Sequence, residues 1–156
     1  MSKSLKRVTR ALTEAGVDHQ MHEMQTQTRT AQEAADAAGC EIDQIAKSII
    51  LMDQTGNLAL FITAGGNMVD KDKASAISGR PLERADADTV RAVTGFAVGG
   101  VAPVGHKTPI EAWIDPRLLS FATVYAAGGT PRHVFSIAPE EIARLAGARE
   151  ADFIES

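Results

Sequence analysis

A run of glycines inside an apolar stretch constrains this chain more than any other feature of its sequence. Residues 95–106 read Gly-Phe-Ala-Val-Gly-Gly-Val-Ala-Pro-Val-Gly-His. The stretch is too apolar for a solvated linker and too rich in glycine for a regular strand, because glycine permits backbone conformations and close approaches that a Cβ forbids. The run, with Pro103 inside it, predicts a loop that presents backbone amides to a ligand. A tight bend between a helix and a strand is the alternative.

Two further elements stand out on either side of this loop. Upstream, Lys47 interrupts the apolar strand predicted for residues 45–51, and downstream residues 126–131 read Ala-Ala-Gly-Gly-Thr-Pro. Because side chains alternate along a strand, Lys47 shares a face with Ile49 and Leu51. A lysine on such a face is seldom fully buried, so it either extends past the edge of the core or points into a cleft.

These three elements, in this order, resemble the YbaK/EbsC family of aminoacyl-tRNA deacylases, which is related to the editing insertion domain of bacterial prolyl-tRNA synthetases. The resemblance covers nearly the whole chain, from the N-terminal helix to Ile154. It implies a curved, partly barrel-like mixed sheet with helices around it. It also implies hydrolysis of a mischarged aminoacyl-tRNA in trans.

Length and composition bound the class of protein. A chain of 156 residues with 44% hydrophobic and 23% charged residues predicts one globular domain over residues 1–156. No apolar run approaches the ~20 residues that cross a bilayer, and residues 1–16 lack the apolar core of a signal peptide. The single cysteine, Cys40, cannot form an internal disulfide, and we interpret it as structural. We therefore expect a cytoplasmic protein that does not bind membranes.

Apolar periodicity, caps and turn residues predict interspersed helices and strands. Gly16, Gly39 and Gly79 each end a predicted helix, and Thr30 with Glu33 forms a capping box. The elements do not alternate as regular βαβ units, which favours a mixed α/β (α+β) fold around an antiparallel or mixed sheet. The predicted helices cover residues 4–15, 31–38, 70–78, 86 or 88 to 93, and 138–146; the predicted strands cover 17–24, 45–52, 58–63, 110–114, 121–126, 133–137 and 148–153.

The resemblance places the catalytic chemistry on Lys47 and the glycine-rich loop. The family's lysine holds the terminal ribose or phosphate of the tRNA and orients the scissile ester, a task that suits a compact ammonium. Ester hydrolysis passes through a tetrahedral oxyanion, which preorganised backbone amides stabilise. We expect Gly99, Gly100 and Val101 to contribute here, with the amides of residues 100–102 as the candidates. The sequence offers no evident protein nucleophile or general base, which fits the family's use of the tRNA's own terminal hydroxyl to assist a bound water.

Four small residues are predicted to shape the substrate pocket. Ala102 and Pro103 belong to the glycine-rich loop, and Gly128 and Gly129 match the pair that forms the floor or wall of the aminoacyl pocket in the family. A Gly-Gly pair between two strands is also typical of a hairpin turn, and both interpretations can hold together.

Three polar residues complete the predicted substrate-binding set. Ser48 follows the lysine, where other subgroups carry asparagine or threonine, so position 48 bears on the subgroup. His106 follows the loop and is a candidate polar group near the substrate, or a surface or core residue. Asp115 either faces the site or initiates the turn before Pro116.

Metal and nucleotide motifs are not evident in the sequence. His19 and His22 fall on opposite faces of their predicted strand, and no cysteine or carboxylate completes a zinc set with them. The chain has no Walker loop, no Rossmann fingerprint and no serine in a nucleophile elbow. We predict neither a metal nor a cofactor.

The charge distribution limits how the chain can contact tRNA. The net charge of −4 is not typical of a protein that binds nucleic acid broadly. Contact is therefore expected at the acceptor end or through a local basic patch. Lys3, Lys6, Arg7 and Arg10, on one face of the first helix, are the candidates, with a merely solvated face as the alternative.

The predicted function is trans-editing of proline tRNA that carries alanine, cysteine, serine or threonine, with prolyl-tRNA synthetase as a candidate partner. A pocket separates substrates that differ by one methylene by only ~1–3 kcal/mol, so a second sieve is needed. One alternative is a non-catalytic module that binds an acceptor end or a nucleotide and docks on a synthetase. Another is a structural homologue without activity on tRNA. Lys47→Ala separates catalysis from docking, because docking would depend on the basic helix instead.

Overall fold

The computed structural model describes residues 2–156, whose strands join in one mixed sheet. The strand order is β1-β7-β6-β2-β3-β5-β8, and β4 pairs with β2 beside this path. The pairs β2–β6, β3–β5 and β5–β8 are parallel, and the other pairs are antiparallel. This confirms the mixed α/β fold predicted from the sequence. The strands are β1 (His19–Glu23), β2 (Ile45–Met52), β3 (Leu58–Ala64), β4 (Glu83–Arg84), β5 (Glu111–Ile114), β6 (Val124–Ala127), β7 (His133–Ile137) and β8 (Arg149–Glu150).

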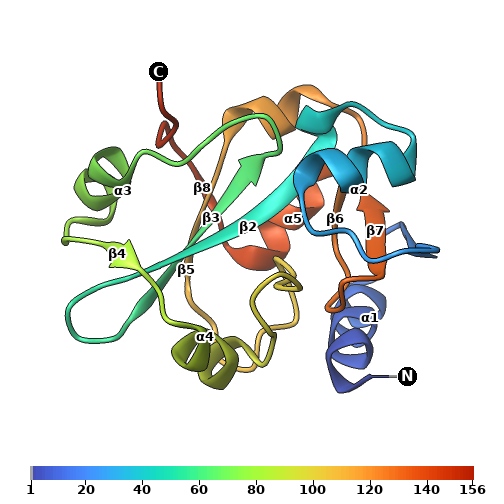
Figure 1. Cartoon of the computed structure of the whole chain (residues 1–156), viewed down its shortest axis with the longest axis horizontal. Coiled ribbons are helices and arrows are strands. Elements are labelled where there is room, and N and C mark those ends of the chain that lie inside the picture. Colours follow the sequence, from blue (N-terminus) through green and yellow to red (C-terminus); the bar gives the residue numbers. More distant parts are fainter. Residues whose placement is uncertain (1) are drawn as a thin grey trace.

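The helices lie around this sheet, with α3 towards one end of the long strands β2 and β3 and with α1 and α2 towards the other (Figure 1). No helix within residues 2–156 combines the length and the apolarity that a membrane span requires. The helices are α1 (Lys3–Ala15), α2 (Ala31–Ala38), α3 (Lys71–Ser78), α4 (Ala87–Thr94) and α5 (Pro139–Ala146), and the 3-10 helices are η1 (Ile42–Gln44) and η2 (Pro116–Ser120).

Alternating residues of the central strands separate two apolar clusters. Leu60 and Ile62 of β3 belong to the main cluster, which α1 and α5 cover. Phe61 belongs to the second cluster, under α3, where its ring stacks on Trp113 at 5.2 Å and meets the edge of Phe153 at 5.0 Å. β3 is therefore buried on both faces, which explains why it reads as a nearly continuous apolar run.

Local capping signals set most helix boundaries where they were predicted. The Thr30 hydroxyl accepts the amide of Glu33 at 3.1 Å. The Glu33 carboxylate accepts the amide of Arg29 at 3.3 Å, so the reciprocal bond of the capping box falls one residue earlier than expected. Asp86, and not Asp88, begins α4, because its carboxylate accepts the amide of Thr89.

Short strands are the elements that the sequence predicted least well. The strand expected over 148–153 is β8, which ends at Glu150, because the chain then leaves β5 and buries Phe153 under α3. The strand expected from residue 121 begins at Val124, after η2. β4 was not predicted, because two residues carry no periodicity.

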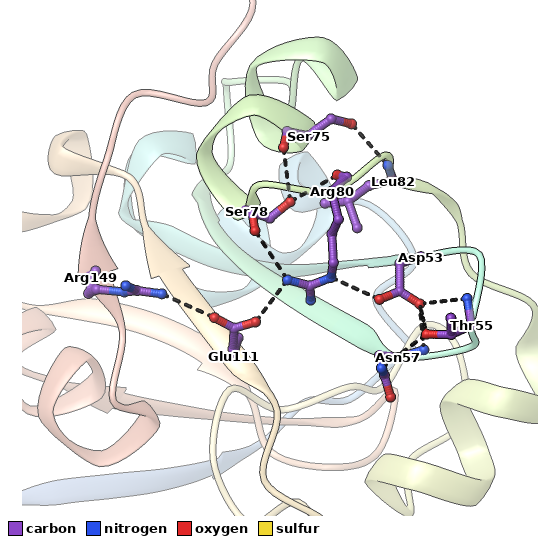
Figure 2. A network of polar contacts seen from close by, with 9 residues as sticks. All are labelled: Asp53, Thr55, Asn57, Ser75, Ser78, Arg80, Leu82, Glu111 and Arg149. Atoms are coloured by element: carbon purple, nitrogen blue, oxygen red, sulfur yellow. Dashed lines mark hydrogen bonds and ion pairs between the residues drawn. The ribbon is translucent and has the colours of Figure 1, made fainter.

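A polar network fastens the segment that leads into β4 (Figure 2). The Arg80 guanidinium pairs with Asp53 of the β2–β3 turn at 2.9 Å and with Glu111 of β5 at 2.8 Å. The Ser75 hydroxyl accepts the amide of Leu82 at 3.0 Å. β4 therefore has a fixed position beside β2, although it is only two residues long.

Candidate functional site

An apolar hollow lies where one edge of β2 has no strand beside it. β6 pairs with this edge only at Ile45 and Ala46, and β4 pairs only at Leu51 and Met52. The gap opens into a cavity of about 450 Å³, which we call the main cavity. It is lined by β2, by residues 28–31, by Val98, Gly99 and Val101, and by the β6–β7 hairpin.

The register of the sheet shows which backbone groups face this gap. The Ile62 carbonyl accepts the amide of Asp115, so the backbone of Ile62 faces β5 and that of Thr63 faces β2. Lys47 pairs with Thr63 and therefore directs its amide and carbonyl to β3. The amide and carbonyl of Ser48 point the other way, along the open edge. Ser48 thus offers a donor and an acceptor to a ligand in the main cavity.

Lys47 stands on the face of β2 that was predicted, with Ile49 and Leu51. Its ammonium donates to the Gly65 carbonyl at 3.3 Å and lies 3.8 Å from the sulfur of Met68. Partial burial lowers the pKa of Lys47, and the carboxylates of Asp115 and Asp43 partly oppose this shift. Lys47 also lines the main cavity.

The segment that holds Lys47 is itself clamped by two carboxylates. Asp115 is 3% exposed and accepts the Ala64 amide at 3.1 Å, the Asn67 side-chain amide at 2.9 Å and the Arg117 amide at 3.0 Å. Asp43 accepts the amide of Gly66 at 2.9 Å. Both carboxylate oxygens of Asp115 thus bond groups of the fold, and its side chain does not line the main cavity. Of the two interpretations of Asp115, the structure favours initiation of the turn.

Gly65 explains why this segment contains a Gly-Gly pair. A Cβ at Gly65 would overlap the carbonyl oxygen of Ile42, which belongs to η1. Only glycine allows the end of β3 to approach η1 this closely. Backbone packing against η1 therefore fixes the position of the Gly65 carbonyl, which accepts the hydrogen bond from the Lys47 ammonium.

The Ser48 hydroxyl is the polar atom of the cavity wall that lacks a partner. Its oxygen is buried and makes no hydrogen bond within residues 2–156, and Ser48 lines the main cavity. Buried hydroxyls are normally hydrogen-bonded.

The glycine-rich loop reaches the main cavity with some of its predicted residues. Gly99, Val101 and the exposed Val98 line it, and Gly100 does not. The Gly100 amide donates to the Ala97 carbonyl at 3.0 Å and so closes a turn. This amide is therefore engaged, which removes it from the candidate oxyanion donors. Val101 is the predicted donor of the loop that also lines the cavity.

The later part of the loop belongs to the core. Ala102 is fully buried in the main apolar cluster, and Pro103 is buried as well. His106 donates through Nε2 to the Ala102 carbonyl, 2.6 Å away, and meets the edge of the Phe96 ring. Burial lowers the pKa of His106, the bond to Ala102 opposes this, and the charge of Arg7 adds to it. None of the three predicted substrate contacts lines the main cavity.

Gly128 and Gly129 form the predicted turn between β6 and β7. The Gly128 amide donates to the His133 carbonyl at 2.7 Å. Gly129 has φ +98°, and a Cβ there would lie 2.9 Å from the backbone of Ser4 at the start of α1. Neither glycine lines the main cavity, whereas the neighbouring Thr130 does. Gly129 instead packs against the start of α1.

Arg7 does not belong to a solvated basic face. Its guanidinium donates to the carbonyls of Gly95 and Gly105 and lies over the Phe96 ring, 5.0 Å from the centroid. The residue thus ties α1 to both ends of the glycine-rich loop. The remaining cations of the predicted patch, Lys3, Lys6 and Arg10, are exposed.

Several residues of the main cavity were not predicted from the sequence. Arg29 and Thr30 come from the start of α2, Tyr125 and His133 from the β6–β7 hairpin, and Arg84 from β4. His133 is held by the Thr130 hydroxyl, 2.6 Å from Nδ1. Thr30 and Thr130-Pro131 were identified only as cap and turn residues, because nothing in their local pattern reveals what lies opposite. Within residues 2–156, no group of three or more His, Cys, Asp or Glu side chains is arranged to hold a metal ion.

Comparisons with known proteins agree with this architecture. The model of the aminoacyl-tRNA editing domain family matches residues 25–145. A crystal structure provisionally assigned as a trans-editing enzyme for prolyl-tRNA synthetase superposes with a TM-score of 0.93 and 44% identity, covering 100% of this chain and 99% of that one. The uncharacterized protein YwhH of Bacillus subtilis is 28% identical over 142 residues, which are 91% of this chain and 90% of YwhH.

A further relative carries a more specific name. EbsC of Enterococcus faecalis, provisionally named a Cys-tRNA(Pro)/Cys-tRNA(Cys) deacylase, is 22% identical over 124 residues, which are 79% of this chain and 76% of EbsC. The family predicted from the sequence and its enzyme class, an aminoacyl-tRNA deacylase, are thereby confirmed. The chain belongs to the aminoacyl-tRNA editing domain family.

Proposed function

We propose that this protein hydrolyses mischarged proline tRNA in trans and releases a small non-cognate residue: alanine, cysteine, serine or threonine. The observation that carries the proposal is the main cavity at the open edge of β2, which brings together Lys47, Ser48, Gly99 and Val101. Family membership supports an aminoacyl ester as the ligand. The structure that is 44% identical and the name of EbsC support proline tRNA as the carrier.

In this proposal the reaction is a simple ester hydrolysis. A water molecule adds to the ester carbonyl, and the acyl carbon–oxygen bond to the terminal ribose then breaks. The products are the free amino acid and a tRNA with a free terminal hydroxyl. The Val101 amide faces the oxyanion, and the Lys47 ammonium holds the ribose or its phosphate. The protein contributes position and electrostatic stabilisation.

The Ser48 position supports selection of small residues. The Ser48 carbonyl on the open edge can accept a hydrogen bond from the α-ammonium of the aminoacyl group. The unpartnered Ser48 hydroxyl can form a hydrogen bond with the thiol of cysteine or the hydroxyl of serine or threonine. An alanyl group would leave this hydroxyl unsatisfied, which costs about 1–3 kcal/mol. We therefore place cysteine, serine and threonine ahead of alanine as substrates of this chain.

The test is a panel of proline tRNAs charged with alanine, cysteine, serine, threonine and proline. Lys47→Met removes the ammonium and keeps most of the side-chain volume. Lys107→Met, at an exposed position outside the cavity, is the matched control. We expect selective loss of a mischarged species with the wild type and the control, and no loss with Lys47→Met. Hydrolysis of prolyl-tRNA at the same rate, or full activity of Lys47→Met, would contradict the proposal.

A different set of variants distinguishes the docking alternative from catalysis. A synthetase-docking module would depend on Lys3, Lys6 and Arg10, the exposed cations of α1. Arg7 is not a suitable probe, because its guanidinium holds the glycine-rich loop. A triple change of the three exposed cations to glutamine should therefore leave deacylation intact if the chain acts alone. Addition of prolyl-tRNA synthetase to the same assay tests the candidate partner directly.

A further inference from the structure

A second cavity of about 270 Å³ lies on the face of β2 that carries Lys47. Ile49, Leu51 and Val69 give it an apolar floor. Met68 forms its wall and is 60% exposed, a high value for a large apolar side chain in a folded protein. An exposed apolar side chain above an apolar hollow is typical of a binding surface.

The second cavity shares part of its lining with the main cavity. Lys47, Ile49, Leu51 and Arg84 line both of them. Two of these shared residues, Lys47 and Arg84, are cations. Arg84 is exposed, and within residues 2–156 it forms no ion pair, whereas Lys71 on the far rim is paired with a carboxylate. The shared lining therefore carries two cations and no carboxylate, whereas Glu83 lines only the second cavity, where it pairs with Lys71.

We propose that the second cavity binds the penultimate nucleoside of the tRNA acceptor end, with the connecting phosphate held between Lys47 and Arg84. This inference rests on the proposed function. If the aminoacyl ester lies over the open edge of β2, the terminal nucleoside lies beside Lys47. The next nucleotide then extends from the main cavity towards the second cavity, past the residues that line both. A nucleobase is flat and apolar on its faces, which suits a floor of aliphatic side chains under a methionine.

Both walls of the second cavity are held in place before any ligand binds. Figure 2 shows the segment before β4 fixed by Arg80 and by the Ser75–Leu82 bond, which positions Arg84. On the other side, the Met68 carbonyl accepts the amide of Glu155 at 2.9 Å. A site whose walls are already ordered loses less entropy when it binds a nucleotide.

The experiment compares two small substrates that differ by this nucleotide. One is the cysteinyl ester of adenosine and the other is the cysteinyl ester of the dinucleotide cytidylyl-adenosine. Met68→Ala removes the apolar wall of the second cavity. Val98→Ala is the matched control, because Val98 is 62% exposed, close to the value of Met68, and lines only the main cavity.

We expect the wild type to hydrolyse the dinucleotide ester with the higher kcat/KM. In Met68→Ala the ratio of the two kcat/KM values should fall about fivefold, from the apolar contact that is lost, while Val98→Ala should leave the ratio unchanged. A wild-type ratio of one, or an equal effect of Met68→Ala on both esters, would overturn the inference. If neither ester nor any mischarged tRNA is hydrolysed, the proposed function itself has failed.

A binding measurement keeps the inference testable if only full-length tRNA is hydrolysed. The chain has five methionines, and the methyl signal of Met68 is identified by its loss in Met68→Ala. Addition of cytidylyl-adenosine should shift this signal, and adenosine alone should not. A Met68 signal that both compounds shift, or that neither compound shifts, would overturn the proposed subsite.

Discussion

The role of Asp115 can be tested by comparing two substitutions that remove different parts of its hydrogen-bonding capacity. One carboxylate oxygen accepts the Ala64 amide and the Asn67 side chain, and the other accepts the Arg117 amide at the start of η2. Asparagine keeps one oxygen acceptor and presents an NH₂ group on the other side. Alanine keeps neither.

The expected losses follow from these contacts. Asp115→Asn can keep the two bonds to the 64–67 segment and lose only the helix cap, which is worth about 1 kcal/mol. Asp115→Ala also leaves the fully buried Ala64 amide unpaired, and that adds about 1–3 kcal/mol. For a chain of this size each kcal/mol moves Tm by about 2–4 °C. We expect Tm to fall by about 3 °C in the first variant and about 9 °C in the second.

Thermal unfolding followed by circular dichroism measures these shifts in Tm. The pH dependence of the deacylation rate tests the effect of Asp115 on the pKa of Lys47. The Asp115 carboxylate raises the pKa of Lys47 against the effect of burial. In Asp115→Asn the loss of deacylation at high pH should therefore begin at a lower pH than in the wild type. Equal loss of stability in the two variants would refute the assignment of the bonds. A large rise in KM with unchanged Tm would show that Asp115 contacts the substrate after all.

Three other predictions concern the parts that support the site. Arg7→Met loses two bonds to carbonyls and the contact with the Phe96 ring. The free energy of unfolding in urea should therefore fall by about 2 kcal/mol. Gly129→Ala places a Cβ at positive φ against the start of α1, so we expect a loss of about 1–3 kcal/mol in the same assay, with Gly147→Ala as the control for positive φ in open space. Because burial lowers the pKa of His106, the unfolded chain binds more protons around the ordinary histidine pKa. Stability should then fall as the pH decreases through that range, and His106→Gln should reduce this dependence in melts between pH 5 and 8.

Local signals in the sequence predicted the regular elements well. Thr30, Asp86 and the glycine after each helix act within a few residues of their own position, so the boundaries that they set survive folding. The apolar run of β2 and the turn after it were sufficient to predict the β2–β3 hairpin. β4 escaped prediction because its pairing with β2 depends on Arg80, whose partners Asp53 and Glu111 are distant in the sequence.

Residues of the candidate site could be predicted only where the amino-acid type itself indicates an unusual backbone conformation or an unusual charge. Lys47 stands out because it is a cation in an apolar strand, and Gly99 because it lies in an apolar loop. His106 and Asp115 were expected at the substrate because polar side chains near such a loop suggest chemistry. Their partners, the Ala102 carbonyl and the amides around residue 64, are backbone groups that a sequence does not show. Tyr125 and His133 were missed because only the fold brings their hairpin opposite β2.

The open edge of β2 is difficult to explain unless something binds there. An unpaired strand edge exposes amides and carbonyls to pairing with another chain, and proteins usually cover or interrupt such edges. Here β6 and β4 cover the two ends of β2 and leave residues 47–50 without a strand, while residues 28–31, Val98, Gly99 and Val101 wall the gap from the sides. Those walls leave a cavity and not a groove long enough for another strand. A small group with its own donors and acceptors, such as an aminoacyl ester, can still reach Ser48. The arrangement therefore prevents a strand of another chain from pairing with the open edge, and it leaves room for an aminoacyl ester, the ligand of the family.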